Sequence, residues 1–129
     1  MSKIKDLMKS NGISNEEIDK LKEFLNGQYR NIWITTKRLA VYVRKGHHYI
    51  NGKIEDTLDI ANISVNKKYG GKGIGMQFIN EAHETHPYSF TYIENVLNPS
   101  FDEKLRKGGW IVIPSNIEPF CYIKNKVQK

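Results

Sequence analysis

The sequence predicts an α/β (α+β) fold in which helices flank a mixed, mostly antiparallel sheet of about six strands. Residues 3–26 show the apolar spacing of two short helices, and from residue 32 the apolar period changes to two. An alternating strand that ends at Val65 is followed by an amphipathic stretch and then by another strand, an order that indicates a parallel crossover. We expect one domain over residues 1–129, with helices over residues 1–28 and the sheet and ligand-binding core over residues 29–129.

The N-terminal helical pair is predicted from its end signals. The first helix ends at Asn11-Gly12, because these residues adopt the left-handed conformation readily. The second begins at a capping box in which Ser14 and Glu17 satisfy each other's free backbone donors. Apolar faces are formed by Ile4, Leu7 and Met8 in the first helix, and by Ile18, Leu21 and Leu25 in the second. We expect these helices to form a lid over the sheet, whereas a partner-binding helix is the alternative.

The sheet is predicted to begin with three antiparallel strands. Residues 32–36 and 38–49 are rich in β-branched and aromatic residues, and residues 57–65 alternate apolar with polar side chains. Asn51-Gly52 is a strong hairpin signal between the second and third of these strands.

The second half of the chain is predicted to alternate helices with strands. Ile74, Phe78, Ile79 and Ala82 have helical spacing up to Pro87. A strand over residues 90–97, a short helix over residues 100–107 and two strands over residues 110–113 and 119–124 complete the order.

Four glycines occupy six positions between the third strand and the following helix, from Gly70 to Gly75. Glycine lets the backbone approach a ligand closely, and the first N–H groups of a helix attract anions. The expected ligand is therefore a phosphate, and a flexible loop without a ligand is the alternative. Ligands bind beyond the carboxyl ends of the strands near a crossover, which is where this loop is expected to lie.

Composition limits the function classes further. The chain carries 20 basic and 14 acidic residues, a net charge of +6. This excess is spread evenly along the chain, so no basic arm indicates nucleic-acid binding. We expect a cytoplasmic protein with no membrane association, because no apolar run is long enough to span a bilayer, residues 1–6 are too charged for a signal peptide and the only cysteine is Cys121.

Two motifs in order resemble the GNAT superfamily of acyl-CoA-dependent N-acetyltransferases. The pyrophosphate loop of that family reads Arg/Gln-x-x-Gly-x-Gly/Ala, and Gly73 and Gly75 occupy its two glycine positions. Further along, Asn98-Pro99-Ser100-Phe101 leads to Lys107-Gly108-Gly109-Trp110, which resembles the second motif at matching spacing. The resemblance covers residues 38–124, with a less specific likeness to compact forms from phages and mobile elements.

The resemblance implies an enzyme that moves an acetyl group from acetyl-CoA to a primary amine by direct attack. The pantetheine arm would pair with an open strand edge, and backbone amides of the glycine loop would hold the pyrophosphate. The implied cofactor-binding residues are Ile63, Ser64, Val65, Gly70, Gly71, Lys72, Gly73, Ile74, Gly75 and Asn98.

Three features depart from the family pattern. Gly70 stands where Arg or Gln is usual, and Leu105 stands where many members place a tyrosine that protonates the leaving thiolate. Helical signals begin near residue 3, where the family has its first strand. The first two departures support one alternative, a catalytically silent module that binds CoA or a partner.

The candidate general bases are Glu94 and then Asp59, because direct transfer needs an amine that loses a proton near the thioester. As alternatives, Glu94 pairs with Arg44 and Asp59 simply belongs to the polar face of its strand. Tyr42, Tyr92 and Tyr122 are possible replacements for the missing acid, although packed rings with satisfied hydroxyls are expected for all three.

For the histidines and the cysteine we expect structural roles before catalytic or metal-binding ones. His47 and His48 are expected to be exposed turn residues, with a role as base or substrate ligand as the alternative. His83 and His86 lie three residues apart on one helix, but no further Cys/His cluster accompanies them, so we expect no metal. Cys121 is expected to be a buried structural thiol, and the side chains expected in the core include Trp33, Trp110 and Phe120.

The acceptor is an amine-bearing molecule of a class that the sequence does not specify. A nucleic-acid amine is an alternative acceptor that fits the positive charge. A monomer and a homodimer are equally compatible with the sequence.

Overall fold

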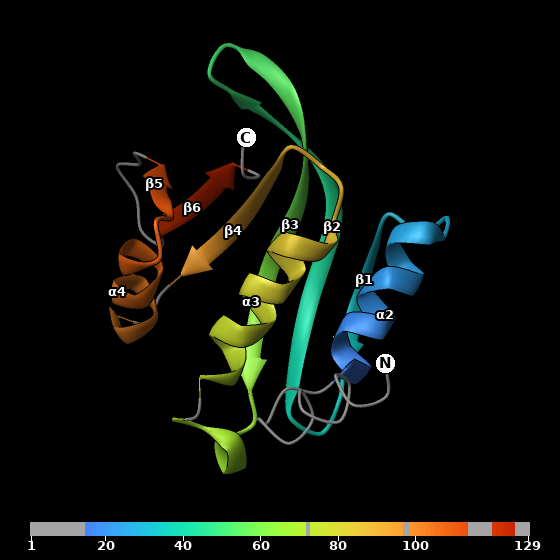
Figure 1. Ribbon diagram of the computed structural model, residues 1–129, viewed down its shortest axis with the longest axis vertical. Coiled ribbons are helices and arrows are strands. Elements are labelled where there is room, and N and C mark those ends of the chain that lie inside the picture. The colour runs from blue at the N-terminus through green and yellow to red at the C-terminus, as the bar shows by residue number, and fades with distance from the viewer. Residues whose placement is uncertain (1–14, 72, 97–98, 114–119, 126–129) are drawn as a thin grey trace.

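The computed structural model describes residues 15–71, 73–96, 99–113 and 120–125. In this part of the chain six strands form one sheet in the order β1-β2-β3-β4-β6-β5 (Figure 1). The strands are β1 (Asn31–Thr35), β2 (Leu39–Ile50), β3 (Lys53–Val65), β4 (Phe90–Val96), β5 (Ile111–Ile113) and β6 (Phe120–Asn125). The helices are α2 (Asn15–Asn26), α3 (Ile74–Thr85), α4 (Pro99–Lys107) and the short 3₁₀ helix η1 (Lys67–Tyr69).

The pairing of these strands confirms the predicted mixed sheet. Neighbours β1 and β2, β2 and β3, β4 and β6, and β5 and β6 are antiparallel. Only β3 and β4 are parallel, and α3 makes the crossover between them, as the sequence predicts. Helix α2 confirms the second helix of the predicted N-terminal pair. The first predicted helix, together with Ser14 of the capping box, lies outside the described residues.

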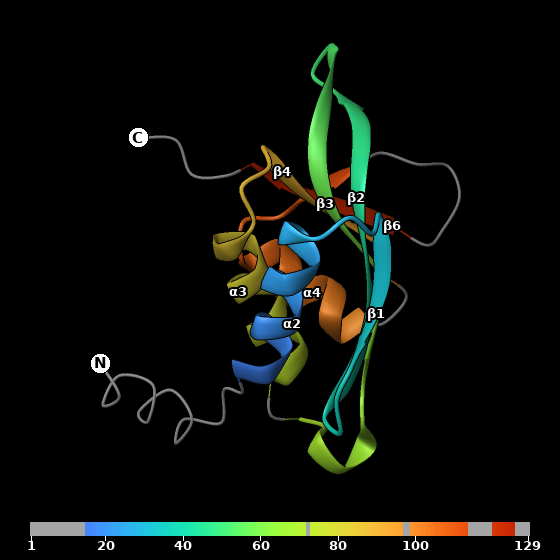
Figure 2. The same cartoon turned by 90° about the vertical axis from the view of Figure 1, so that its right-hand side faces the viewer.

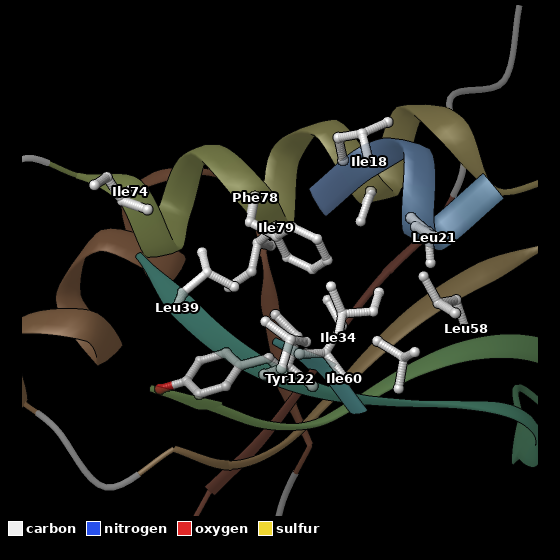
Figure 3. Close-up of a cluster of buried hydrophobic side chains, with 14 of the residues drawn as sticks. Ile18, Leu21, Ile34, Leu39, Leu58, Ile60, Ile74, Phe78, Ile79 and Tyr122 are labelled. Carbon is white, nitrogen blue, oxygen red and sulfur yellow. The ribbon is translucent and has the colours of Figure 1, made fainter. Parts of the chain in front are cut away.

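The core lies between the sheet and helices α2 and α3, which cover the same face of it (Figure 2). Figure 3 shows Leu58 and Ile60 of β3 below the apolar side chains of α2 and α3. Alternation puts Ile34 of β1 into this core with no exposed surface, and consequently Trp33 lies on the other face, 54% exposed. The prediction of a core position is therefore wrong for Trp33, whereas it is confirmed for Trp110; the side chain of Phe120 is outside the described part.

A buried carboxylate joins α2 to the turn between β1 and β2. Glu17 accepts a hydrogen bond of 2.6 Å from the hydroxyl of Thr36 and is paired with Arg38 at 3.4 Å. Burial raises the pKa of the Glu17 carboxyl, but these hydrogen bonds and the Arg38 charge outweigh it, so the pKa lies below its ordinary value of 4.5. The ionised form of Glu17 therefore stabilises the fold, and this stabilisation is lost as the pH falls through the lowered pKa.

The hairpin between β2 and β3 turns at the predicted Asn51-Gly52, where both residues have positive φ, 52° and 89°. Its far end extends beyond the neighbouring strands, because β1 pairs with β2 only as far as Arg44 and β4 begins to pair with β3 at Thr57 (Figures 1 and 2). Among the described residues there is no helix long and apolar enough to cross a membrane.

Candidate functional site

The parallel strands β3 and β4 pair over only four residues each and then part. Pairing runs from Thr57 opposite Phe90 to Ile60 opposite Ile93, and after that β3 continues to Val65 in pairing with β2 alone. At the same point β3 has one residue more than β2: Val43 pairs with Ile60 and Tyr42 pairs with Asn62, so Ala61 is an extra residue. Such a bulge leaves a backbone group of β3 outside its ladder with β2. On its other side β3 has an open edge beyond Ile60, because β4 no longer pairs with it there.

A pocket of about 370 Å³ opens along the end of β3. Its lining comes from β3, from the glycine loop with the first turn of α3, and from α4. Gly75 of α3 lies close to β3 and to α4. A Cβ atom at this position would lie 3.5 Å from the side chain of Val65 on β3 and 3.6 Å from the ring of Phe101 on α4. The lining residues are Ile63, Val65, Tyr69, Gly70, Gly71, Gly73, Ile74, Gly75, Met76, Phe101 and Lys104.

The glycine loop adopts a conformation that needs its glycines at two positions. Gly71 and Gly73 have φ of 76° and 75°, in the left-handed region that other residues rarely adopt. Gly73 is also the N-cap of α3, and it provides no side-chain hydrogen bond to the helix start. The first turn of α3 contains no acidic residue. Its backbone N–H groups at the pocket are thus available to an anion, which the helix dipole favours at this end.

Most of the predicted cofactor-binding residues meet in this pocket. Seven of the ten line it, namely Ile63, Val65, Gly70, Gly71, Gly73, Ile74 and Gly75. Ser64 lies between two of them on β3, but its side chain is exposed on the opposite side of the strand. Lys72 and Asn98 lie outside the described residues. Sequence reasoning did not assign the lining positions Tyr69, Met76, Phe101 and Lys104, although Phe101 belongs to the second motif.

A network of polar side chains lies across β2, β3 and β4, close to the point where β3 and β4 part. Its centre is Asp59, which is 2% exposed and pairs with Tyr92 in the parallel register. The carboxylate of Asp59 accepts a hydrogen bond of 2.6 Å from Thr57 and contacts Arg44 at 3.5 Å. Because Leu58 and Ile60 on either side face the helices, Asp59 faces away from them.

His48 is the third partner of Asp59. Its Nε2 atom lies 3.0 and 3.1 Å from the two oxygens of that carboxylate. The imidazole ring stacks on Tyr92, with ring centres 3.6 Å apart and an angle of 5° between the planes. The expectation of an exposed turn residue is therefore wrong for His48, whose side chain is 24% exposed, while His47 is 57% exposed and pairs with Asp56. The reason is that β2 continues to Ile50, so His48 lies within the paired part of β2, beside β3, and not in the turn.

Glu94 follows directly after the last pair of β3 and β4, and its carboxylate forms an ion pair with Arg44. One atom each of Glu94, Asp59 and His48 lies within 4.8 Å of the other two, a set that is able to hold a metal ion. The guanidinium of Arg44 contacts both carboxylates and so supplies the positive charge that a cation would supply. The structure thus brings together both candidate bases, and it adds Arg44 and His48 to them.

Two other expectations concern tyrosines and histidines. Tyr122 is fully buried, yet its hydroxyl has no hydrogen-bond partner among the described residues, so the expected satisfied hydroxyl is wrong here. Figure 3 shows the Tyr122 ring beside the apolar cluster, with its oxygen at the outer end. His83 lies on α3 and His86 is the residue that caps its C-terminal end, so the two do not both belong to the helix as expected. Both are buried and contact the hydroxyl of Thr91 at 2.7 and 2.5 Å, which gives them a structural role.

Solved structures of other proteins resemble this chain. No family model and no curated protein matches the sequence. The solved structure of a tyrosine variant of the AtaT toxin, bound to acetyl-CoA and to the C-terminus of the antitoxin AtaR, matches with a TM-score of 0.57 and 10% identity over 69% of this chain and 59% of that chain. The chain in the KacTA–DNA complex matches with a TM-score of 0.57 and 11% identity over 87% of this chain and 77% of that one. The fold is that of the GNAT acetyltransferases.

This GNAT fold confirms the fold that the resemblance of the two motifs implied. A third match is AtaT in complex with acetyl-methionyl-tRNAfMet, with a TM-score of 0.53 and 10% identity over 66% of this chain and 61% of that chain. The chain therefore spans about three fifths of the AtaT toxin, and at such low identity the likeness concerns the arrangement of helices and strands.

Proposed function

We propose that this chain is an N-acetyltransferase that binds acetyl-CoA in the pocket at the end of β3 and transfers the acetyl group to a primary amine. The observation that carries the proposal is the coincidence of three features in one place. The glycine loop and the start of α3 form one end of the pocket, the open edge of β3 forms its side, and the fold is one in which a neighbour binds acetyl-CoA.

The pocket offers each part of acetyl-CoA a suitable partner. The diphosphate would accept hydrogen bonds from backbone N–H groups between Gly70 and Met76, where the helix dipole adds a favourable potential. The pantetheine arm is an extended chain with two amides, and it would pair with the open edge of β3 as an added strand. The thioester would then lie near Ala61, where the bulge leaves a backbone group to stabilise the oxyanion of the transition state.

A catalytically silent acyl-CoA-binding module is the alternative that the sequence raises. Gly70 removes a side-chain contact to the phosphates, and Leu105 is fully buried in the core and has no proton to donate. Against this alternative, the polar network of Arg44, His48, Asp59 and Glu94 lies where the acetyl group would be presented. A module that only binds CoA has no need for such a network at that end of the site.

The acceptor that we propose is an amine carried by RNA. The specific support is the neighbour AtaT, which was solved with acetyl-methionyl-tRNAfMet. The net charge of +6 would attract any polyanion to this chain. Affinity for an aminoacyl-tRNA should fall steeply as salt is raised from about 50 to 200 mM, because bound counterions are released. A flat salt dependence, with full transfer to small amines, would point to a small-molecule acceptor instead.

The binding of acetyl-CoA is tested by a pair of matched substitutions. Gly73 and Gly52 both have positive φ, and a Cβ atom at either position has no neighbour within 4 Å, so Glu at each position introduces the same strain and the same charge. The Gly73→Glu carboxylate would face the diphosphate, which we expect to cost on the order of 2 kcal/mol, roughly a 30-fold weaker affinity in calorimetry. Gly52→Glu at the hairpin turn should leave the affinity unchanged. Equal affinities of both variants and the original chain would contradict the assignment of the pocket.

A further inference from the structure

We propose that His48, held in place by Asp59, is the group that takes the proton from the acceptor amine. The inference rests on the proposed acetyl transfer and goes beyond it, because it assigns the acid–base step to a residue that neither motif contains. It is based on the geometry of the polar network on the face of the sheet opposite to α2 and α3.

The contacts of His48 fix which ring nitrogen carries the proton. The carboxylate of Asp59 has only acceptor atoms, and Nε2 of His48 is within 3.1 Å of both of them. Nε2 must therefore be the N–H donor, which leaves the lone pair of Nδ1 free to accept a proton. Stacking on Tyr92 at 3.6 Å fixes the plane of the ring, so the position of Nδ1 is determined as well. Nδ1 makes no hydrogen bond to the described residues, and the side chain is 24% exposed and within reach of a substrate.

The position of His48 fits the place where the amine must arrive. Its partners Asp59 and Tyr92 form the register pair next to Ile60 and Ile93, after which β3 and β4 part. The pocket reaches this open edge from the side of the helices, since Ile63 and Val65 line it beside Gly75 of α3. An amine that approaches from the opposite face would therefore meet the thioester at the edge of the network.

The two carboxylates of the network are less suited to the same task. Glu94 forms an ion pair with Arg44, so the guanidinium already occupies its carboxylate. Asp59 is 2% exposed and accepts hydrogen bonds from Thr57 and His48, so it has no direct contact with a substrate. The charged or titratable groups that face His48 are Arg44 on β2, Asp59 and the register partner Glu55 on β3, and Tyr92 and Glu94 on β4. Asp59 acts as a positioning residue for His48.

The step balances without any further reactant. The lone pair of the amine forms the new C–N bond at the thioester carbonyl, and one N–H proton moves to Nδ1 of His48. The C–S bond then breaks, and its electron pair leaves with sulfur as the CoA thiolate. The imidazolium ion of His48, which Asp59 stabilises, returns its proton to solvent.

The test uses His48→Ala with His47→Ala as the matched control. His47 is the adjacent histidine and has its own carboxylate partner, Asp56, outside the network. Transfer from acetyl-CoA is measured with a panel of primary amines and aminoacyl-tRNA, and acetyl-CoA affinity is measured by calorimetry. We expect His48→Ala to lower kcat about 100-fold, as is usual for the loss of a general base, with unchanged acetyl-CoA affinity. Added imidazole should restore a large part of the rate and of its rise with pH, and His47→Ala should stay within about twofold of the original chain.

The outcomes distinguish this inference from the proposed function. If the chain fails to bind acetyl-CoA, the proposed function is overturned together with everything built on it. If it binds acetyl-CoA and His48→Ala transfers at the original rate, only the role of His48 is overturned. A loss of rate that imidazole does not restore, with an unaltered pH profile, would also overturn only the role of His48. A chain that binds acetyl-CoA but neither acetylates any amine nor hydrolyses the thioester would overturn the proposed function and the role of His48 together.

Discussion

Gly46 lies so close to Asp59 that the addition of one methyl group, in Gly46→Ala, should disturb the polar network. It lies on β2 between Arg44 and His48 and faces Asp59, whose side chain is close to it. A Cβ atom at residue 46 would lie 2.3 Å from Oδ2 and 2.7 Å from both Cγ and Oδ1 of that carboxylate. Gly46→Ala therefore forces the carboxylate of Asp59 to turn away from its present partners.

The cost follows from the hydrogen bonds that would break. The carboxylate accepts from Thr57 at 2.6 Å and from His48 at 3.0 Å, and it is 2% exposed, so water does not replace these donors. Hydrogen bonds to a charged group contribute about 1.5 to 3 kcal/mol each, and partial reorganisation recovers some of that. We expect Gly46→Ala to lower the free energy of unfolding by about 2 to 3 kcal/mol. For a chain of this length that corresponds to a Tm lower by about 10 °C.

The assay is a double-mutant cycle by urea unfolding. In the background of Asp59→Ala the new methyl group at residue 46 meets no carboxylate, so Gly46→Ala should then change the free energy of unfolding by less than about 0.5 kcal/mol. The coupling between the two sites should thus be about 2 kcal/mol. If Gly46→Ala costs the same in both backgrounds, the clash with Asp59 is not its cause and the reasoning is refuted. Turnover should fall with Gly46→Ala alone, because His48 loses its positioning residue.

Two further predictions concern buried polar atoms. Glu17→Gln removes the charge that is paired with Arg38 and should lower the free energy of unfolding at pH 7 by about 1.5 kcal/mol. Because the pKa of Glu17 is lowered from 4.5, the difference in free energy of unfolding between the original chain and Glu17→Gln should shrink as the pH falls below 4.5. A difference that stays constant from pH 7 to pH 3 would contradict this. Tyr122→Phe removes a buried hydroxyl that has no partner among the described residues, and it should raise the free energy of unfolding by about 1 kcal/mol in the same measurement. A lower turnover at unchanged stability would instead mark that hydroxyl as the acid that protonates the thiolate.

The pocket beside the glycine loop was largely predictable because its signal is local. Residues Gly70 to Gly75 are adjacent in the chain, and positive φ at Gly71 and Gly73 is a property that glycine itself provides. The alternation that ends at Val65 and the helical spacing that begins at Ile74 place this loop between a strand and a helix. Phe101 and Lys104 were missed as lining residues, since only the packing of α4 against the end of β3 brings them there.

The polar network was only partly predictable because its members come from three strands. The sequence indicates Glu94 and Asp59 as single residues, and the ion pair between Glu94 and Arg44 is one of its two interpretations of Glu94. The role of His48 follows from the register of β2 against β3, which places it two pairs beyond Gly46 and lets it reach Asp59. A shift of β2 by one residue against β3 would turn Arg44 and His48 to the face opposite to Asp59.

The sequence by itself determined the order of helices and strands, the hairpin turn and the glycine loop before α3, because backbone preferences act between residues that are close along the chain. The tertiary structure decided that Ala61 bulges, that β3 parts from β4 after Ile60, and that His48, Asp59, Glu94 and Arg44 meet at that point. These features depend on strand register and on the parallel crossover, which are set by the packing of the whole sheet against α2 and α3.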